Sequence, residues 1–336
     1  MGTCRSVGGV TGRLAVVAVM GALLLARAAQ PAAAAEKVVF ATTGSVVGVV
    51  TSIAKSKQFD AKNGIDLDLK SFPPDRAMQA LVQKNVDAGI LGVVAAVRAN
   101  ARNNPIRIIA PLMTSHWSVV VPADSPAKSF ADLKGQRVGS LSQVTGIYNI
   151  AKLILKMRGI DIDNDFKLVF GAPQVLQGLL LKKELAGVIQ SDQNTIRKIA
   201  DGEFRELANL GEIWTDLTGA EFLTSVAVGV DEGWVKENPQ RSQRLVRTIA
   251  ESLGFVRAHP AETFAAAKEI LGIKTEAQMQ LMVKMLPRMY PSAWNPKLLE
   301  STKLFLRKNI EFGLLPAEAA QHIDTVFSHM PKEIAF

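Results

Sequence analysis

The chain has 336 residues, of which 48% are hydrophobic, and its formal net charge is +8. This length and composition suit two domains of ordinary size with buried cores. The positive charges are spread along the chain without a run of five or six lysines or arginines, so we expect neither nucleic acid nor a membrane surface as a partner.

Residues 1–35 have the pattern of a cleaved signal peptide, which predicts a periplasmic protein. Two arginines precede an apolar run at positions 14–26, and Ala33–Ala35 supply small residues before a cleavage point. The apolar run is too short to span a membrane. Cleavage would remove the only cysteine, Cys4, and three arginines, which leaves a formal charge of +5. A chain without cysteine has no disulfide, thiolate metal site or cysteine nucleophile.

An internal repeat follows, with one copy at residues 37–91 and the other at residues 136–189. Each copy reads as a short apolar strand, a polar loop, a helix ending near Gly-Ile-Asp, a strand ending in phenylalanine, a proline with a short helix, and a small buried strand. This order predicts an α/β fold of two lobes, each a mostly parallel sheet flanked by helices. Ligands of such sheets bind beyond the carboxyl ends of the strands, where both polar loops would lie.

The polar loop of the second copy, Ser142–Gly146, stands before a helix predicted over residues 147–157. Free N–H groups at the start of a helix favour an anion or a polar oxygen. An ordinary N-cap by Ser142 or Thr145 explains the same residues equally well.

Two crossings between the lobes are expected. Residues 119–122 are strand-like and end at a proline, and residues 223–230 are again β-rich. We therefore assign residues 36–120 and 224–336 to the first lobe, with C-terminal helices, and residues 121–223 to the second. Two crossing strands make a hinge.

No catalytic signature is present. None of the four histidines stands at metal-ligand spacing, and the chain has no GxSxG elbow, no GxxxxGK[ST] loop and no GxGxxG after a strand. We therefore expect no enzyme activity, no cofactor and no metal.

Several segments resemble the type 2 periplasmic solute-binding proteins of ABC importers, within the group for sulfonates, taurine, nitrate and thiamine precursors. The segments are Asp132–Val138, the Ser/Thr loop before Tyr148, Glu237–Pro239, His259–Glu262 and Phe312–Leu315. The resemblance implies a two-lobed binding protein with two hinge strands and a small molecule in the cleft. Thiamine-pyrimidine synthases share the fold but rely on cysteine- and histidine-rich segments, which the cysteine-free chain argues against.

The resemblance also implies that the loop ends supply the ligand contacts. These residues are Thr42, Thr43, Gly44, Ser45, Asp75, Gly92, Val93, Ser115, His116, Trp117, Ser142, Gln143, Thr145, Gly146 and Asp192.

Several of these residues have a second interpretation. Trp117 or Tyr148 could form an apolar wall, although Trp117 suits a core position better than the site. His116 could be a pH-sensitive donor or a hydrogen-bonded hinge residue. Asp75 could cap the helix that follows it. If Asp75 and Asp192 face the cleft, an amine or a neutral polar ligand fits; we rank a small organic anion first.

The expected function is capture of a small organic solute, such as a sulfonate or carboxylate, and its delivery to an ABC permease in the inner membrane. We expect a monomer. Two alternatives stay open: a periplasmic solute sensor, and an enzyme on the same fold.

Overall fold

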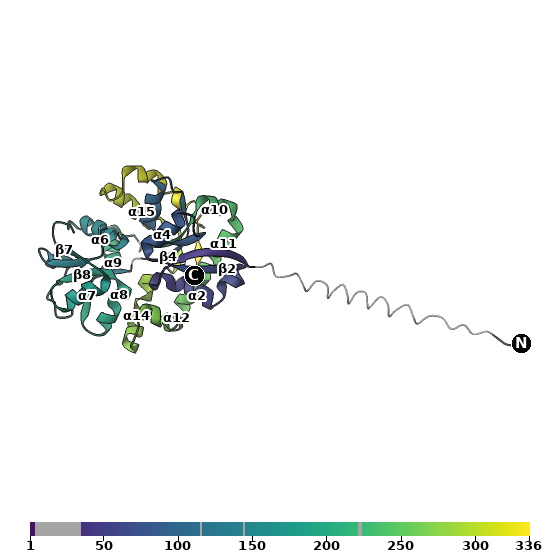
Figure 1. Ribbon diagram of the computed structural model, residues 1–336, viewed down its shortest axis with the longest axis horizontal. Helices are drawn as coiled ribbons and strands as arrows, with labels where there is room; N and C mark the ends of the chain where they lie inside the picture. Colours follow the sequence, from purple (N-terminus) through teal and green to yellow (C-terminus); the bar gives the residue numbers. More distant parts are fainter. Residues whose placement is uncertain (4–34, 115, 144, 221–223) are drawn as a thin grey trace. The chain divides into compact units, whose positions relative to one another are not determined.

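A computed structural model describes residues 1–3, 35–114, 116–143, 145–220 and 224–336 (Figure 1). Residues Glu36–Phe336 form one compact unit, separate from Met1–Ala35. The expected signal peptide lies almost wholly outside the described residues. Among the described residues, no helix is long and apolar enough to cross a membrane.

The compact unit is built on two five-stranded sheets, which confirms the predicted α/β fold. The first sheet has the order β2 (Ile65–Ser71), β1 (Glu36–Thr42), β3 (Ala88–Gly92), β10 (Val226–Asp231) and β4 (Ile106–Met113). The second sheet has the order β7 (Lys167–Phe170), β6 (Arg137–Ser140), β8 (Gly187–Ser191), β5 (Trp117–Pro122) and β9 (Phe204–Asn209). We call the elements around the first sheet the first lobe and those around the second sheet the second lobe.

The internal repeat is confirmed by the pairing of the strands. Strand β1 pairs in parallel with β2 and β3, and β6 pairs in parallel with β7 and β8. The helix of each copy ends in a turn at an equivalent glycine, with φ of 74° at Gly64 and 75° at Gly159. Such angles are open to glycine at no steric cost, which explains the repeated Gly-Ile-Asp.

The first crossing lies upstream of its predicted position. Strand β5 pairs with β8 and β9, so residues 119–122 belong to the second sheet and the boundary predicted at 120 is too late. Val119, Val120 and Val121 are at most 1% exposed, and only the interior of a sheet can bury such a run on both faces. The chain therefore crosses between Met113 and Trp117. The return crossing precedes β10, which lies inside the first sheet between β3 and β4.

Helices cover both faces of each sheet. Those that follow the strands of the first lobe are η1 (Val46–Gly48), α2 (Val49–Ser56), α3 (Phe59–Lys62), α4 (Pro74–Val82) and α5 (Val93–Asn100). Those of the second lobe are η2 (Phe130–Leu133), α6 (Gly146–Met157), α7 (Pro173–Leu181), α8 (Asp192–Ala200) and α9 (Leu210–Thr218).

The C-terminal part of the chain returns to the first lobe and is mostly helical, as predicted. Its elements are α10 (Glu232–Glu237), α11 (Pro239–Ala258), α12 (Pro260–Ala266), α13 (Lys268–Leu271), α14 (Glu276–Met289), β11 (Ala293–Trp294), α15 (Pro296–Glu311), η3 (Ala317–His322), η4 (Thr325–Phe327) and β12 (Ile334–Ala335).

The two lobes exchange apolar side chains. Ile196 of α8, in the second lobe, is fully buried in the core cluster of the first lobe. Phe305 of α15 is fully buried in the core cluster of the second lobe, with its ring centroid 5.6 Å from that of Trp214. The indole N–H of Trp214 also donates to Ser301 Oγ at 3.2 Å. Helices α8 and α15 thus hold the lobes together outside the two crossings.

Candidate functional site

The first polar loop joins β1 to η1 and is held by its own hydroxyl groups. Thr42 Oγ1 lies 2.8 Å from Thr51 Oγ1, and Thr43 Oγ1 lies 2.9 Å from Ser45 Oγ. Thr42 and Thr43 are buried, whereas Gly44 is exposed, and a Cβ at Gly44 would meet no other atom within 4 Å. The loop is therefore fixed at its base and open at its tip.

The tight turn of this loop requires glycine at position 48. A Cβ at Gly48 would stand 1.9 Å from the carbonyl oxygen of Thr43. We expect Gly48→Ala to lower the free energy of unfolding by about 1–3 kcal/mol, because the backbone of the first loop must move to admit the methyl group. Urea unfolding measures this loss. The control is Gly178→Ala in α7, where a Cβ meets nothing within 4 Å and a helix former replaces glycine; an equal loss in both variants would contradict the argument.

The second polar loop stands at the start of α6, and here the N-cap interpretation is observed. Thr145 Oγ1 accepts from the N–H of Tyr148 at 3.4 Å and donates to the carbonyl of Ser142 at 2.7 Å. Ser142, Gln143 and Gly146 are exposed. The predicted helix over residues 147–157 is confirmed, and its first turn caps itself.

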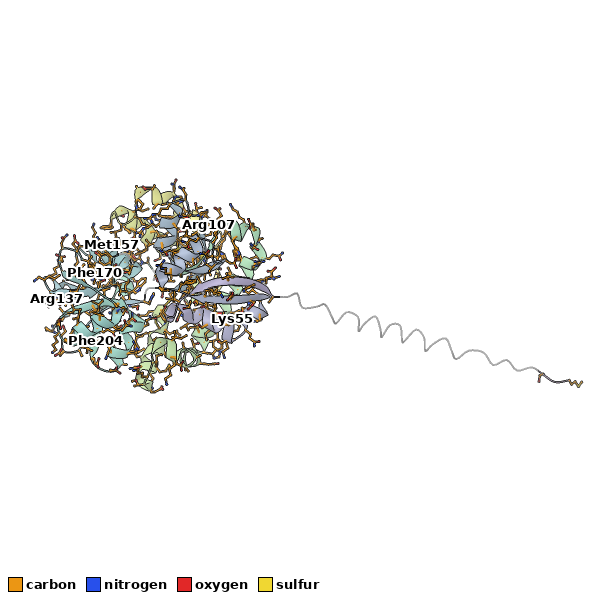
Figure 2. All side chains as sticks on the ribbon, viewed as in Figure 1. Lys55, Arg107, Arg137, Met157, Phe170 and Phe204 are labelled. Carbon is orange, nitrogen blue, oxygen red and sulfur yellow. The ribbon has the colours of Figure 1, made fainter. Side chains whose placement is uncertain are left out.

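Tyr148, one of the two residues considered for an apolar wall of the cleft, is instead buried within the second lobe. Its side chain is 2% exposed, and its ring packs edge-on against Phe170, labelled in Figure 2, at 5.8 Å between centroids. Its hydroxyl donates to the carboxylate of Asp163. Tyr148 is buried because it falls on the apolar face of α6, together with Ala151 and Leu155.

The crossing between β4 and β5 carries His116 and Trp117. Trp117 is 6% exposed and belongs to the core of the second lobe, with its ring 4.6 Å from that of His116. Nδ1 of His116 lies 3.1 Å from the carbonyl oxygen of Thr114. Burial lowers the pKa of His116 to about 4, so it is a neutral hinge residue and not a pH-sensitive donor at neutral pH.

Four more of the predicted ligand contacts are Gly92 and Val93, in the turn after β3, and Asp75 and Ser115. Gly92 is partly exposed, but Val93 is buried in the first-lobe core and its N–H donates to the carbonyl of Ser225 at 3.2 Å. Ser115 lies outside the described residues, as does the side chain of Asp75 at the start of α4.

Asp192 stands at the centre of a buried charged cluster that we call the junction cluster: Ser118, Asp192, Glu206 and Arg288. Asp192 is fully buried at the start of α8 and accepts from Ser118 Oγ at 2.6 Å. Arg288 of α14 donates from Nε to Asp192 at 3.1 Å and from both terminal nitrogens to Glu206, at 2.9 and 2.6 Å. The cluster therefore binds the first-lobe helix α14 to the second lobe.

The electrostatics of the junction cluster are set by burial. Two carboxylates surround one guanidinium, and burial raises the pKa of Asp192 to about 6, because desolvation outweighs the attraction of Arg288. Asp192 is fully engaged by these partners, so it does not present a carboxylate to an amine ligand. No sequence pattern pointed to Arg288 or Glu206, since they lie 96 and 14 residues from Asp192 along the chain.

Hydrogen bonds bring some of the predicted ligand contacts close to one another. The N–H of Asp192 donates to the carbonyl of His116 at 2.8 Å, and the next residue, Gln193, contacts Val46 at the end of the first polar loop. The start of α8, the crossing and the first loop are therefore neighbours. The described residues of the second loop, 142–143 and 145–146, make no side-chain hydrogen bond or ion pair to the first lobe.

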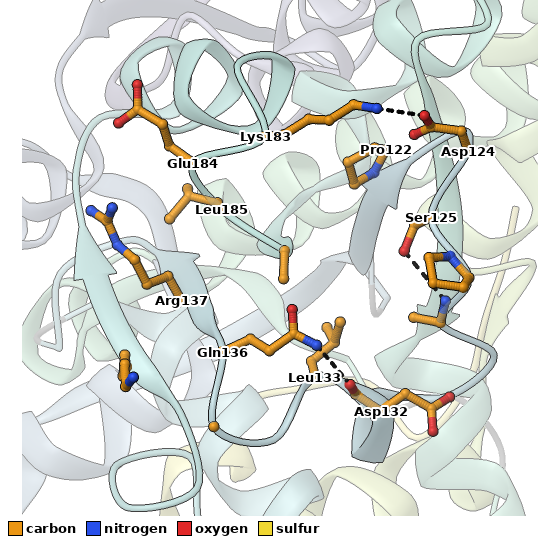
Figure 3. A pocket seen from close by; sticks show the side chains of 15 residues that line it. Pro122, Asp124, Ser125, Asp132, Leu133, Gln136, Arg137, Lys183, Glu184 and Leu185 are labelled. Carbon is orange, nitrogen blue, oxygen red and sulfur yellow. Dashed lines mark hydrogen bonds and ion pairs between the residues drawn. The ribbon is translucent and has the colours of Figure 1, made fainter.

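Of three cavities, one lies away from these loop ends and two adjoin the crossing or the junction cluster. The largest, about 620 Å³, is lined by residues such as Asp124, Arg137 and Lys183 (Figure 3). It lies where β6 and β8 begin, which is the sheet edge opposite the predicted ligand loops. A cavity of about 450 Å³ is lined by Thr114 of the first crossing, by α9 and by residues 287–298. One of about 250 Å³ adjoins Glu206 and Arg288 of the junction cluster.

Comparison with known proteins fits this architecture. A family model described as "NMT1/THI5 like" matches residues 49–263, more than half of the chain. The chain belongs to the NMT1/THI5-like family. A Brucella abortus protein whose name assigns it provisionally as a binding protein is 27% identical to this chain over 238 residues, covering 68% of this chain and 71% of that protein. A 4-amino-5-hydroxymethyl-2-methylpyrimidine phosphate synthase from Aspergillus parasiticus is 24% identical, covering 66% of this chain and 67% of the synthase.

Solved structures place this NMT1/THI5-like protein among periplasmic binding proteins by fold. The aliphatic sulphonate binding protein SsuA of Escherichia coli matches with a TM-score of 0.70 and 18% identity, covering 87% of this chain and 92% of SsuA. The nitrate-binding protein NrtA of Synechocystis PCC 6803 matches with a TM-score of 0.65 and 15% identity, covering 87% and 86%. The resemblance stated from the sequence is thereby confirmed for family and fold.

Proposed function

We propose that this protein is an exported solute-binding protein that holds a small organic anion, such as a sulfonate or carboxylate, between its lobes and delivers it to an ABC permease. The observation that carries the proposal is the pair of equivalent loops after β1 and β6. Each loop follows the first strand of its repeat, at the carboxyl edge where ligands of α/β sheets bind.

The chemistry of the two loops supports an anionic oxygen as the bound group. Each loop offers hydroxyls and helix-start N–H groups next to an exposed glycine, Gly44 or Gly146, where a Cβ would meet nothing within 4 Å. Hydrogen bonds to a charged oxygen are stronger than those to a neutral one. Among the predicted contact residues, neither lysine nor arginine is present, so hydroxyl and backbone donors would carry the recognition.

Binding would act on the hinge. A ligand that contacts loops of both lobes stabilises the closed arrangement by its preference for that arrangement. A permease would then recognise the closed protein. We propose no catalysis, since the fold neighbours that match most of the chain are named as binding proteins.

The first test is a thermal-shift screen of residues 36–336 with alkyl and aryl sulfonates, carboxylates, nitrate, pyrimidines and amino acids. A ligand that binds only the native state raises the melting temperature. We expect a shift confined to one class of organic anion, and no new product after incubation. A shift confined to amines, or turnover of a bound compound, would contradict the proposal.

Replacing Ser45 and Thr145 together by alanine is expected to weaken binding of the identified anion by about tenfold or more, because we propose that each hydroxyl turns from its present partner to donate to the charged ligand. Isothermal titration calorimetry measures the change. Thr145→Ala also removes the N-cap of α6, so Ser45→Ala is measured alone as well. The control is Ser328→Ala on an exposed serine far along the chain. Unchanged affinity in the double variant would remove both residues from the site.

A further inference from the structure

The two repeats differ in the way in which N–H groups at the start of the helix after each polar loop are satisfied. In the second lobe, Thr145 caps its own helix. In the first lobe, Ser45 precedes η1 but makes no capping bond, because its hydroxyl is paired with that of Thr43 at 2.9 Å. The N–H groups at a helix start have no partner within the helix.

The missing cap is supplied by the other lobe. Gln193 Oε1 accepts from the N–H of Val46 at 2.5 Å, across 147 residues of sequence. The turn that presents this N–H is fixed, since the buried hydroxyl of Tyr290 donates to the carbonyl of Val46 at 2.8 Å. Gln193 is itself held at the start of α8, directly after Asp192 of the junction cluster. A neutral amide oxygen from the second lobe therefore lies on the donor at the end of the first polar loop.

We propose that Gln193 is a specificity-determining residue that competes with the ligand: its amide oxygen holds the lobes together through Val46 and is displaced when an anionic oxygen binds there. This inference rests on the proposed function, because it uses the same first loop. A neutral oxygen forms a weaker hydrogen bond than a carboxylate or sulfonate oxygen, so an anion can displace Gln193 while an uncharged oxygen gains little. Selectivity for charged ligands follows from this competition.

Two substitutions at one position have opposite expected effects on affinity. Gln193→Ala removes the competitor, so the identified anion should bind about three- to tenfold more tightly. Gln193→Glu keeps the length of the side chain and places a charged oxygen on the N–H of Val46, so the same anion should bind at least about tenfold more weakly. The matched control is Asn194→Ala, whose side-chain bond to Ser191 Oγ, 2.9 Å, stays within the second lobe; its affinity should equal that of the unaltered protein. Titration calorimetry gives all four values.

A second measurement tests the bond between the lobes without any ligand. Residues 36–336 contain no cysteine, so spin labels can be placed at Arg102→Cys in the first lobe and Lys182→Cys in the second, both exposed positions. Electron spin resonance measures the distribution of distances between the two labels. In Gln193→Ala the mean distance should lengthen and the distribution should broaden. The distribution should stay the same in Asn194→Ala and become narrower in Gln193→Glu. Unchanged distances in Gln193→Ala would overturn the role of Gln193 in holding the lobes.

The outcomes separate this inference from the proposed function. An anion that binds the unaltered protein and binds Gln193→Ala equally or more weakly overturns the competition and leaves the proposed function standing. An anion that binds only Gln193→Ala supports the competition. No binding by any anion of the panel, in either protein, overturns both, whereas the distance measurement still decides whether Gln193 holds the lobes.

Discussion

Arg288→Met is expected to lower the free energy of unfolding by about 3 kcal/mol or more at pH 7, because it leaves one fully buried and one partly buried carboxylate without their cation. Asp192 is fully buried and Glu206 partly so, and Arg288 reaches both of them at 3.1 Å or less. Methionine retains most of the apolar stem, so the loss reports on the charge and its hydrogen bonds. Urea unfolding followed by circular dichroism measures it.

The control for this variant is an exposed ion pair. Arg158 lies 3.1 Å from Asp216, with side chains 40% and 69% exposed, so Arg158→Met should cost no more than about 1 kcal/mol. The cost of Arg288→Met should also shrink at pH 5, where Asp192 takes up a proton and needs no cation. Equal losses in the two variants, or a cost independent of pH, would show that Arg288 does not neutralise the junction cluster.

The pH dependence of stability is expected to carry a contribution from Asp192 that opposes that of most carboxylates. Burial raises the pKa of Asp192 from its ordinary 3.8 to about 6 in the folded chain. Between pH 4 and pH 6 the unfolded carboxyl has lost its proton while the folded one retains it, so this contribution to stability falls as the pH rises. The difference in pKa corresponds to about 3 kcal/mol over that range.

The test compares the protein with Asp192→Asn by urea unfolding from pH 4 to pH 7. Carboxylates whose pKa is lowered by partners, such as Asp132 and Asp165, stabilise the fold as the pH rises and are common to both proteins. The difference between the two proteins isolates Asp192 and should change by about 3 kcal/mol, with its midpoint near pH 5. A constant difference across this range would mean that Asp192 is ionised throughout.

Much of the fold follows from local patterns in the sequence. The strand at residues 137–140 and the helix that ends at Met157 lie where their periodicity predicts them, because each is set by neighbours within a few residues. The first crossing was placed too late because a valine run suits a crossing strand and an interior strand equally well. Only the pairing of β5 with β8 and β9 decides between them.

The candidate site was less predictable, since its contacts join distant segments. Tyr148 is one of two candidates for an apolar wall from the sequence, yet the face of α6 on which it falls is the buried one. Gln193 and Arg288 are ordinary polar residues of helices, and nothing near them in sequence points to Val46 or Asp192. Thr145 illustrates the opposite case, since its N-cap role depends only on the next three residues.

The order of strands in the two sheets also determines when each lobe can fold. Strands β5 to β9 of the second sheet are consecutive in the chain, so that sheet is complete once Asn209 has been synthesised. In the first sheet, β3 and β4 are joined only through β10, which begins at Val226. Pairings over such distances in sequence form slowly. Synthesis therefore passes through a stage in which the second lobe can already be native while the first lobe still lacks the interior strand that joins β3 to β4.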